Sequence, residues 1–289
     1  MKAREAASLL VFGVLAVVLC APFATAGAAL NLESDYVNKV LTLRHFYTGN
    51  HLSFAADGTL IGLEATGPWT LDGQLRVQRI ELRGQSLDIQ GRRLSLVFDK
   101  KGKPSRDVVE LIDESEPNAD ERRKMEEPFL NRTVEIEIAL GPGETIEAEI
   151  ESAMDAVFVK PSESMAELVP DCWREYFEKS EGRAITVRNT TLAPLRESPG
   201  VVSPPRPVST PEPEFSEDAR RAKYQGTVLL SFIVDTSGQV LDVRITTPLG
   251  MGLDEKAVDA VRKWKFEPAK KDGEPVPVQI AVETDFHLY

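Results

Sequence analysis

A proline-rich stretch near residue 200 is the feature that most restricts how this chain can fold. Six prolines fall within the fifteen residues from Pro199 to Pro213. Proline fixes φ and lacks a backbone N–H, so such a segment favours extended geometry and cannot run through a helix or a central strand. We therefore predict a linker at 199–213, with one module at 30–192 before it and a second module at 212–289 after it.

Length and charge agree with two modules and exclude some functions. The chain has 289 residues, enough for about two domains of roughly 150 residues each. Apolar residues make up 42% and charged residues 28%, which are ordinary values for globular proteins. With 46 acidic and 34 basic side chains, the net charge is −12. So acidic a chain repels phosphate backbones, and we expect no nucleic-acid partner.

The N-terminus has the pattern of a secretory signal peptide. Lys2 and Arg4 precede an uncharged apolar core from Leu9 to Leu19, and Ala24-Thr25-Ala26 follows as a small-residue cleavage site. A basic flank, an apolar core of about 7–15 residues and an A-x-A site define such a signal. We therefore predict a signal peptide at 1–26, cleaved after Ala26.

An uncleaved membrane anchor is the alternative to cleavage. The stretch from Ala6 to Leu30 is uncharged and could span about 30 Å of hydrocarbon as a helix. Both interpretations place the rest of the chain outside the cytoplasm.

Residues that could carry chemistry are few and scattered. Cys20 lies in the leader, which leaves Cys172 alone and excludes a framework of disulfides. His45 and His51 flank a Gly-Asn turn and could converge there, although a satisfied or solvent-facing histidine is the simpler interpretation. The sequence has no zinc-ligand spacing, nucleophile motif or dinucleotide-binding fingerprint. We predict a non-enzymatic protein with no catalytic residue, metal or cofactor.

The first module is predicted to be a strand-rich α+β unit of unknown function. Asp57-Gly58 and Asp72-Gly73 each lie between apolar runs, and Asp-Gly suits the two-residue turn of a hairpin. Apolar residues alternate strictly over 134–140, which predicts a strand. The stretch 146–158 fits a helix better than a strand, and a second short helix is predicted at 173–179. We find no family resemblance for this module.

The second module is predicted to be a small antiparallel sheet with one helix packed on a face, in the order β-β-α-β. Alternating apolar residues over 228–234 and a return at 240–245 are joined by Asp235-Thr236-Ser237-Gly238, which is typical of a hairpin. A helix follows, and alternation over 276–282 predicts the last strand.

That helix is predicted to start at Leu253 and to present one apolar stripe. Asp254 and Glu255 would lie in its first turn, where carboxylates favour the helix dipole. The stripe consists of Leu253, Ala257, Ala260, Val261 and Trp264. We expect Trp264 and Phe266 to be core residues.

The motifs of this module resemble the C-terminal domain of the TonB family. They occur in the family's order: Gln225-Gly226-Thr227-Val228, Val234-Asp235-Thr236-Ser237-Gly238, Leu253-Asp254-Glu255-Lys256-Ala257, Ala260-Val261-Arg262-Lys263-Trp264-Lys265-Phe266-Glu267-Pro268-Ala269 and Gly273-Glu274-Pro275-Val276. The resemblance covers 212–289 only.

The resemblance implies a periplasmic peptide-binding function. Domains of this family bind the TonB box of an outer-membrane receptor by pairing it with an exposed sheet edge, in energised transmembrane transport. In such β-augmentation, backbone hydrogen bonds supply affinity and alternate side chains supply specificity. The implied partner-binding residues lie in the last strand and in the segment near it: Glu212, Pro213, Phe215, Val276, Val278, Ile280, Val282 and Phe286.

Departures from the family leave two hypotheses. The Tyr-Pro of the family's first motif is Phe215-Ser216 here, and the core from Leu9 to Leu19 has no polar residue for inner-membrane motor proteins. A TonB-type transducer would keep residues 6–30 as an inner-membrane anchor beside such motors. A soluble periplasmic adaptor would reuse the fold for protein or envelope binding, with a mature chain starting near Gly27. The same sheet edge could also form a homodimer.

Overall fold

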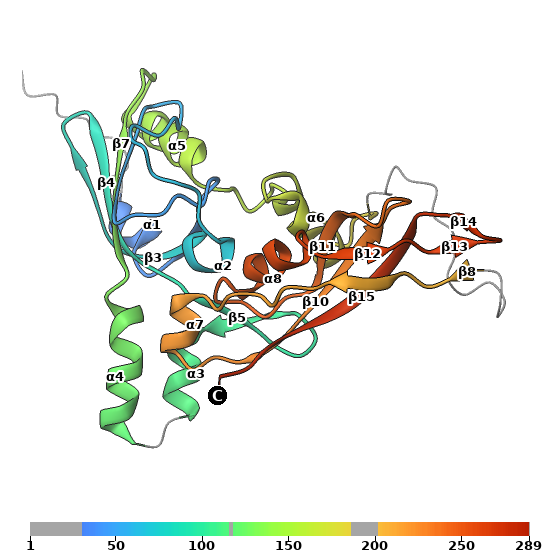
Figure 1. The fold of residues 1–289 in the computed structure, drawn as a ribbon. Coiled ribbons are helices and arrows are strands. Elements are labelled where there is room, and N and C mark those ends of the chain that lie inside the picture. The colour runs from blue at the N-terminus through green and yellow to red at the C-terminus, as the bar shows by residue number, and fades with distance from the viewer. Residues whose placement is uncertain (1–30, 116–117, 186–201, 289) are drawn as a thin grey trace, which may run out of the picture. The chain divides into compact units, whose positions relative to one another are not determined.

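The computed structural model describes residues 31–115, 118–185 and 202–288 (Figure 1). The predicted signal peptide at 1–26 and the alternative anchor lie outside them. In this part of the chain, no helix is long and apolar enough to cross a membrane.

The region before the proline-rich stretch contains a five-stranded mixed sheet, ordered β1-β3-β4-β7-β2. Only β2 and β7 pair in parallel. The strands are β1 (Val40–Thr42), β2 (His51–Phe54), β3 (Gln74–Arg83), β4 (Ser86–Arg93) and β7 (Thr133–Ala139). The alternation predicted over 134–140 is confirmed, because Val134, Ile136 and Ile138 are buried whereas the residues between them are exposed.

One face of this sheet is covered by helix α5 (Ile146–Val157), which confirms the helix predicted at 146–158 (Figure 1). The side chain of Thr145 caps the helix by accepting a hydrogen bond from the N–H of Ala148 at 3.2 Å. Its apolar stripe, including Ile150 and Met154, packs into the core of the sheet. The opposite face of the sheet carries polar side chains.

The two predicted Asp-Gly turns have different outcomes. Gly58 is in the left-handed region (φ 82°) and the N–H of Ala55 donates to the carbonyl of Thr59, so the first turn is tight. The hairpin predicted at Asp72-Gly73 is wrong. Trp69–Asp72 forms helix α2, and Gly73 ends it with φ −81°. The dipeptide serves as a helix end here because Asp72 is buried beside two arginines rather than exposed at a turn.

The remaining elements before residue 186 are short. They are α1 (Leu32–Tyr36), β5 (Leu96–Phe98), β6 (Pro104–Asp107), α3 (Val108–Ser115), α4 (Ala119–Leu130), a 3-10 turn (Met165–Glu167) and α6 (Asp171–Ser180). Helix α6 confirms the helix predicted at 173–179.

The C-terminal region confirms the predicted β-β-α-β order. Its elements are β10 (Gly226–Val234), β11 (Val240–Thr247), α8 (Leu253–Val261) and β15 (Val278–Phe286). The antiparallel sheet runs β11-β10-β15, and α8 lies against it (Figure 1). Gly238 turns the first hairpin with φ 82°. Helix α8 starts at Leu253 as predicted but ends at Val261, so Trp264 lies beyond its end.

The described part of the proline-rich stretch is extended and hydrogen-bonded to the C-terminal region. Strand β9 (Arg206–Ser209) pairs with β12 (Lys265–Glu267). Strand β8 (Val202–Ser203) pairs with β13 (Lys270–Lys271), which forms a tight hairpin with β14 (Glu274–Pro275). Helix α7 (Glu217–Arg221) follows, capped by Ser216.

Two apolar clusters form the interior. One belongs to the five-stranded sheet and α5. The other lies under the C-terminal sheet and also takes in residues from before the proline-rich stretch, among them Trp69, Phe98 and Trp173. The division into domains at 199–213 stays a prediction.

Candidate functional site

The two edges of the C-terminal sheet have different surroundings. Strand β11 forms one edge, and helix α6 packs against it. Strand β15 forms the other edge, paired with β10 along all nine of its residues. Among the described residues no strand pairs with the outer side of β15. The backbone groups on that side are therefore the ones that this part of the sheet leaves open to a further strand.

One contact just past the end of the ladder and another near its middle indicate which β15 residues point outward. In an antiparallel strand, the N–H and C=O of one residue point to the same side and successive residues alternate. The N–H of Leu288, just past β15, donates to the side chain of Gln225 beside β10. The carbonyl of Leu229 accepts from Thr246 on β11, so its even-numbered neighbours face β15. Both contacts indicate that the backbone N–H and C=O groups of even-numbered β15 residues face β10. Those of odd-numbered residues point outward.

A groove of about 660 Å³ lies beside this open edge. The chain from Pro207 to Phe215 forms one side, and the C-terminal half of β15 forms the other. The groove is lined by Pro207, Thr210, Pro211, Glu212, Pro213, Phe215, Trp264, Phe266, Val282, Glu283, Thr284, Asp285, Phe286 and His287. The groove therefore lies between an open strand edge and a partly aromatic wall.

Aromatic contacts hold both sides of the groove in place. The rings of Phe215 and Phe286 meet edge to face, 5.4 Å between centroids. The indole Nε1 of Trp264 donates to the carbonyl of Pro211 at 3.0 Å. Phe232 contacts Trp264 edge to face from inside the sheet. These contacts fix the proline-rich side of the groove relative to β15.

Side chains of β15 divide between two faces. The even-numbered residues point to the face that carries α8, and Val278 and Phe286 are buried there. The odd-numbered residues Gln279, Ala281, Glu283 and Asp285 are exposed on the other face. Both charged side chains of the strand lie on that exposed face.

Comparison with known proteins identifies this region. Residues 211–288 match the family model described as the Gram-negative bacterial TonB protein C-terminal. Residues 211–288 form a TonB C-terminal domain.

Curated relatives named TonB match about a quarter to a third of the chain. Protein TonB of Vibrio cholerae is 30% identical over 103 residues, covering 33% of this chain and 42% of that protein. Protein tonB2 of Pseudomonas aeruginosa is 37% identical over 79 residues, covering 27% of this chain and 29% of that protein. Protein TonB of Escherichia coli is 30% identical over 87 residues, covering 30% and 36%. The chain thus spans less than half the length of these TonB proteins.

A solved TonB structure also aligns with the chain. The solution NMR structure of the Pseudomonas aeruginosa TonB C-terminal domain is 20% identical and covers 35% of this chain and 96% of that one, with a TM-score of 0.25. The family assignment rests on the sequence match and not on this alignment.

Five of the predicted partner-binding residues lie together in the groove of the TonB domain: Glu212, Pro213, Phe215, Val282 and Phe286. The other three do not line it. The N–H of Val276 already donates to the carbonyl of Ala269 at 2.9 Å. Val278 is fully buried opposite Val234, and Ile280 is half-buried opposite Phe232. Whether any of the eight binds a partner stays a prediction.

Sequence reasoning missed the groove role of Trp264 and Phe266, which it placed in the core. Phe266 is buried, but Trp264 is only half-buried and lines the groove. The end of α8 at Val261 is the reason, because it takes Trp264 off the helical stripe. Pro268 lies farther along the chain, so it gave no signal for this earlier end.

The start of α8 also differs from expectation. Asp254 lies in the first turn as predicted, but it is fully buried and accepts hydrogen bonds from the N–H groups of Leu249 (2.7 Å) and Gly250 (2.8 Å). Burial is the largest effect and raises the pKa of Asp254 above its ordinary value. The carboxylate of Asp254 therefore holds the loop between β11 and α8 in place, in addition to interacting with the helix dipole.

Cys172 on α6 lies next to a contact between α6 and α8. The indole of Trp173 donates to Glu255 on α8 at 2.8 Å. Cys172 next to it is buried, and this burial raises the pKa of its thiol to about 12. A thiol with so high a pKa is a packing residue, because reactivity requires the thiolate.

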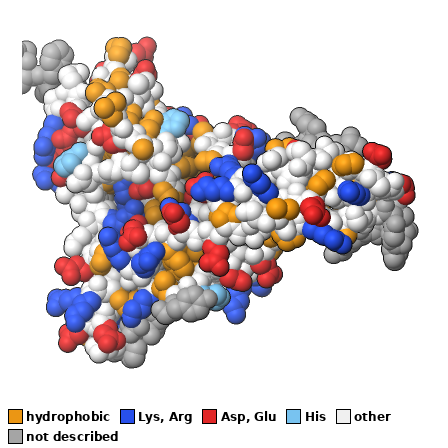
Figure 2. All heavy atoms as spheres, viewed as in Figure 1, with side chains coloured by type: hydrophobic (Ala, Val, Ile, Leu, Met, Phe, Trp, Pro, Cys, Tyr) orange, Lys and Arg blue, Asp and Glu red, His pale blue; other side chains and the backbone are white. Residues whose placement is uncertain are grey.

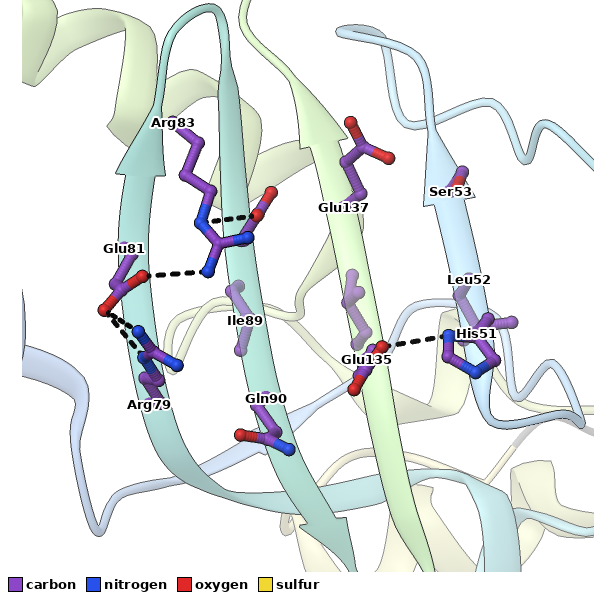
Figure 3. Close-up of a pocket in the computed structure, with 12 residues that line it drawn as sticks. His51, Leu52, Ser53, Arg79, Glu81, Arg83, Ile89, Gln90, Glu135 and Glu137 are labelled. Carbon is purple, nitrogen blue, oxygen red and sulfur yellow. Dashed lines mark hydrogen bonds and ion pairs between the residues drawn. The ribbon is translucent and has the colours of Figure 1, made fainter.

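A second hollow, of about 320 Å³, lies on the polar face of the five-stranded sheet (Figure 3). Its side chains pair with one another: Arg79 contacts Glu81, Arg83 lies 3.3 Å from Asp88, and His51 lies 3.0 Å from Glu135. His45 instead contacts Tyr47, ring centroids 5.7 Å apart, and lines a different hollow. The two histidines are therefore not brought together in one site.

Charge over the rest of the surface is mixed. Figure 2 shows Lys and Arg side chains interspersed with Asp and Glu over the face it presents. Within the described residues, no group of three or more His, Cys, Asp or Glu side chains could hold a metal ion. The groove beside β15 is thus the feature that best combines an open backbone edge with a shaped, partly apolar wall.

Proposed function

We propose that this chain binds an extended segment of an outer-membrane receptor, a TonB box, by adding it as a strand to the outer edge of β15. The interaction would serve energised transport across the outer membrane, without enzymatic chemistry. The observation that carries the proposal is the open edge of β15 next to the aromatic groove. Backbone pairing would supply affinity, and the groove would receive alternate side chains of the segment.

The outward backbone groups suggest where the added strand would pair. Ala281, Glu283 and Asp285 direct their N–H and C=O groups away from β10 by the alternation described above. Glu283 and Asp285 line the groove, and Ala281 directly precedes Val282, the first β15 residue that lines it. Pairing there would leave the β10 ladder intact.

Proline at one outward position tests this mechanism. Ala281→Pro removes an outward N–H without removing a donor to β10, so we expect peptide affinity to fall by roughly tenfold or more, because a hydrogen bond is lost and a ring is added at the contact. The measurement is isothermal titration of the full chain with a TonB-box peptide. Circular dichroism would check that the fold is retained.

One control keeps the result interpretable. Ala281→Ser has a similar size and keeps the N–H, so it should bind like the wild type. Val278→Pro is a poor test. Val278 is fully buried, and as an even-numbered residue of β15 it directs its N–H toward β10. If Ala281→Pro folds normally and binds as tightly as Ala281→Ser, pairing at this edge is refuted.

A soluble periplasmic adaptor is the second candidate. It is favoured by the cleavage motif Ala24-Thr25-Ala26 and by the folded region at 31–185, which lies outside the family match. N-terminal sequencing of the protein from its native envelope separates the two. A first residue near Gly27 supports the adaptor, whereas retention of residues 1–26 supports an anchored transducer.

A further inference from the structure

The exposed face of β15 carries negative charge beside the open edge. Glu283 lies opposite Leu229 and Asp285 lies opposite Thr227 in the β10 register, which places both carboxylates on the face away from α8. Asp285 accepts a hydrogen bond from the hydroxyl of Thr227 and remains exposed. An added strand would lie directly beside these two side chains.

The opposite face of the same edge is apolar. Val282, Phe286 and the rings of Phe215 and Trp264 line the groove on that side. Because side chains of a strand alternate between faces, an added strand would direct every second side chain into this groove. The residues between them would point to the face of Glu283 and Asp285.

No lysine or arginine balances these charges within the groove, although the imidazole of His287 lines it. Glu212, Glu283 and Asp285 line it, and neither Lys nor Arg does. Two cations lie nearby: Arg220 is 5.9 Å over the ring of Phe215 in the groove wall, and Lys256 lies 3.4 Å from Glu214. The edge therefore offers one apolar row and one acidic row.

We propose that the segment bound at β15 alternates apolar and basic residues, with its basic side chains paired across the strand with Glu283 and Asp285. This proposal rests on the proposed function and specifies its ligand. Opposite charges in directly facing cross-strand positions stabilise pairing, and like charges destabilise it. A segment with acidic residues at those positions would meet repulsion from the same two carboxylates.

The expected preference follows from two such pairs. Each cross-strand pair contributes roughly 0.2–1 kcal/mol, and exchanging basic for acidic residues changes both from attraction to repulsion. We expect the basic peptide to bind about tenfold more tightly than the acidic one, a difference of about 1.4 kcal/mol. The preference should shrink at high salt, since both carboxylates are exposed.

The experiment compares three labelled peptides against the full chain by fluorescence anisotropy. They have the pattern Gly-Ser-Val-Xaa-Val-Xaa-Val-Ser-Gly, with Lys, Gln or Glu at both Xaa positions. We expect affinity in the order Lys, Gln, Glu. The double variant Glu283→Lys with Asp285→Lys should reverse that order. The variant Glu267→Lys with Glu274→Lys has the same charge change at exposed residues that do not line the groove, and should keep it.

The outcomes separate the two proposals. Equal affinity for the Lys and Glu peptides, or tighter binding of the Glu peptide, overturns the ligand preference but leaves strand addition standing. A Lys preference that survives the double variant at Glu283 and Asp285 overturns it as well. If none of the three peptides and no TonB-box peptide binds the folded chain, both proposals fall.

Discussion

The β11 edge of the TonB C-terminal domain is packed against helix α6, whereas the β15 edge faces a groove. Beside β11, Arg244 lies 3.7 Å from Glu175 of α6, and Trp173 of the same helix is fully buried. Beside β15, the exposed residues are polar, small or acidic. An unpaired edge invites indiscriminate pairing unless it is covered or charged. This domain uses both solutions, one at each edge, and only the charged edge stays accessible to a ligand.

Removing the large aromatic residue beside each edge should give the largest difference. We expect Trp173→Ala to lower the free energy of unfolding by about 3–5 kcal/mol, since the side chain is fully buried among Trp69, Tyr176 and Phe177. Trp264→Ala, on the half-buried groove side, should lower it by only about 1–2 kcal/mol. Urea denaturation measures both, and equal losses would contradict the contrast between the edges.

The buried acid in the loop after β11 should give a pH-dependent effect. Burial raises the folded pKa of Asp254 above its ordinary value of 3.8, so the folded state holds this proton more tightly than the unfolded state. Its contribution to stability is then greatest below about pH 4 and is lost as pH rises through the raised folded pKa. Asp254→Asn cannot titrate, and its plot of unfolding free energy against pH should be shallower.

The same variant should also be less stable at pH 5. Both carboxylate oxygens of Asp254 accept backbone hydrogen bonds, and an amide presents a donor in place of one acceptor. The cost of leaving one buried N–H unpaired is about 1–3 kcal/mol. Urea titrations from pH 4 to 8 provide the measurement, and a slope identical to that of the wild type would refute the assignment.

The ion pair between α6 and β11 should have a smaller effect. Glu175 also contacts Lys179 at 2.7 Å, and Arg244 also contacts Asp242 at 2.9 Å, so neither charge is left alone when the other is removed. We expect Arg244→Met to lower the unfolding free energy by about 1–2 kcal/mol. A double-mutant cycle with Glu175→Gln isolates the pair, and a coupling energy of zero would show that α6 is held by apolar packing alone.

The smallest effect is expected on the open edge itself. Gln279→Ala changes an exposed side chain of β15, and such surface substitutions are usually within about 0.5 kcal/mol. The unfolding free energy should be unchanged in the same urea assay. A loss of more than about 1 kcal/mol in unfolding free energy would mean that other residues cover this edge. The contrast between the β11 and β15 edges would then no longer hold.

Local patterns predicted much of the fold. Alternation and a turn with glycine were enough to place β10, β11 and β15, and an apolar stripe at helical spacing placed α8, because period and turn chemistry depend on neighbouring residues. Packing between distant segments was not predictable in this way. Trp173 and Glu255 are 82 positions apart, and no local pattern indicates that α6 would cover β11.

The candidate site was predictable in part for the same reason. The groove residues on β15 and at Glu212–Phe215 followed from the resemblance to the TonB family. Trp264 was misplaced because its helical spacing suggested a longer helix, and Asp72 was misplaced because Asp-Gly occurs at helix ends as well as in hairpins. The burial of Asp254 depends on the loop at 249–250 folding back over it, which its position in the first turn does not reveal.

The pairing of the proline-rich stretch with the domain has a mechanical consequence. Strands β8 and β9 are held by ladders of two and three residue pairs, and the indole of Trp264 adds one bond at Pro211. Tension applied to the chain ahead of residue 202 would load these few bonds before the nine-residue ladder of β10 and β15. They would open in turn, and each freed residue would lengthen the tether by up to about 3.5 Å. A pull on this chain would thus be taken up by the release of these segments before it strained β15.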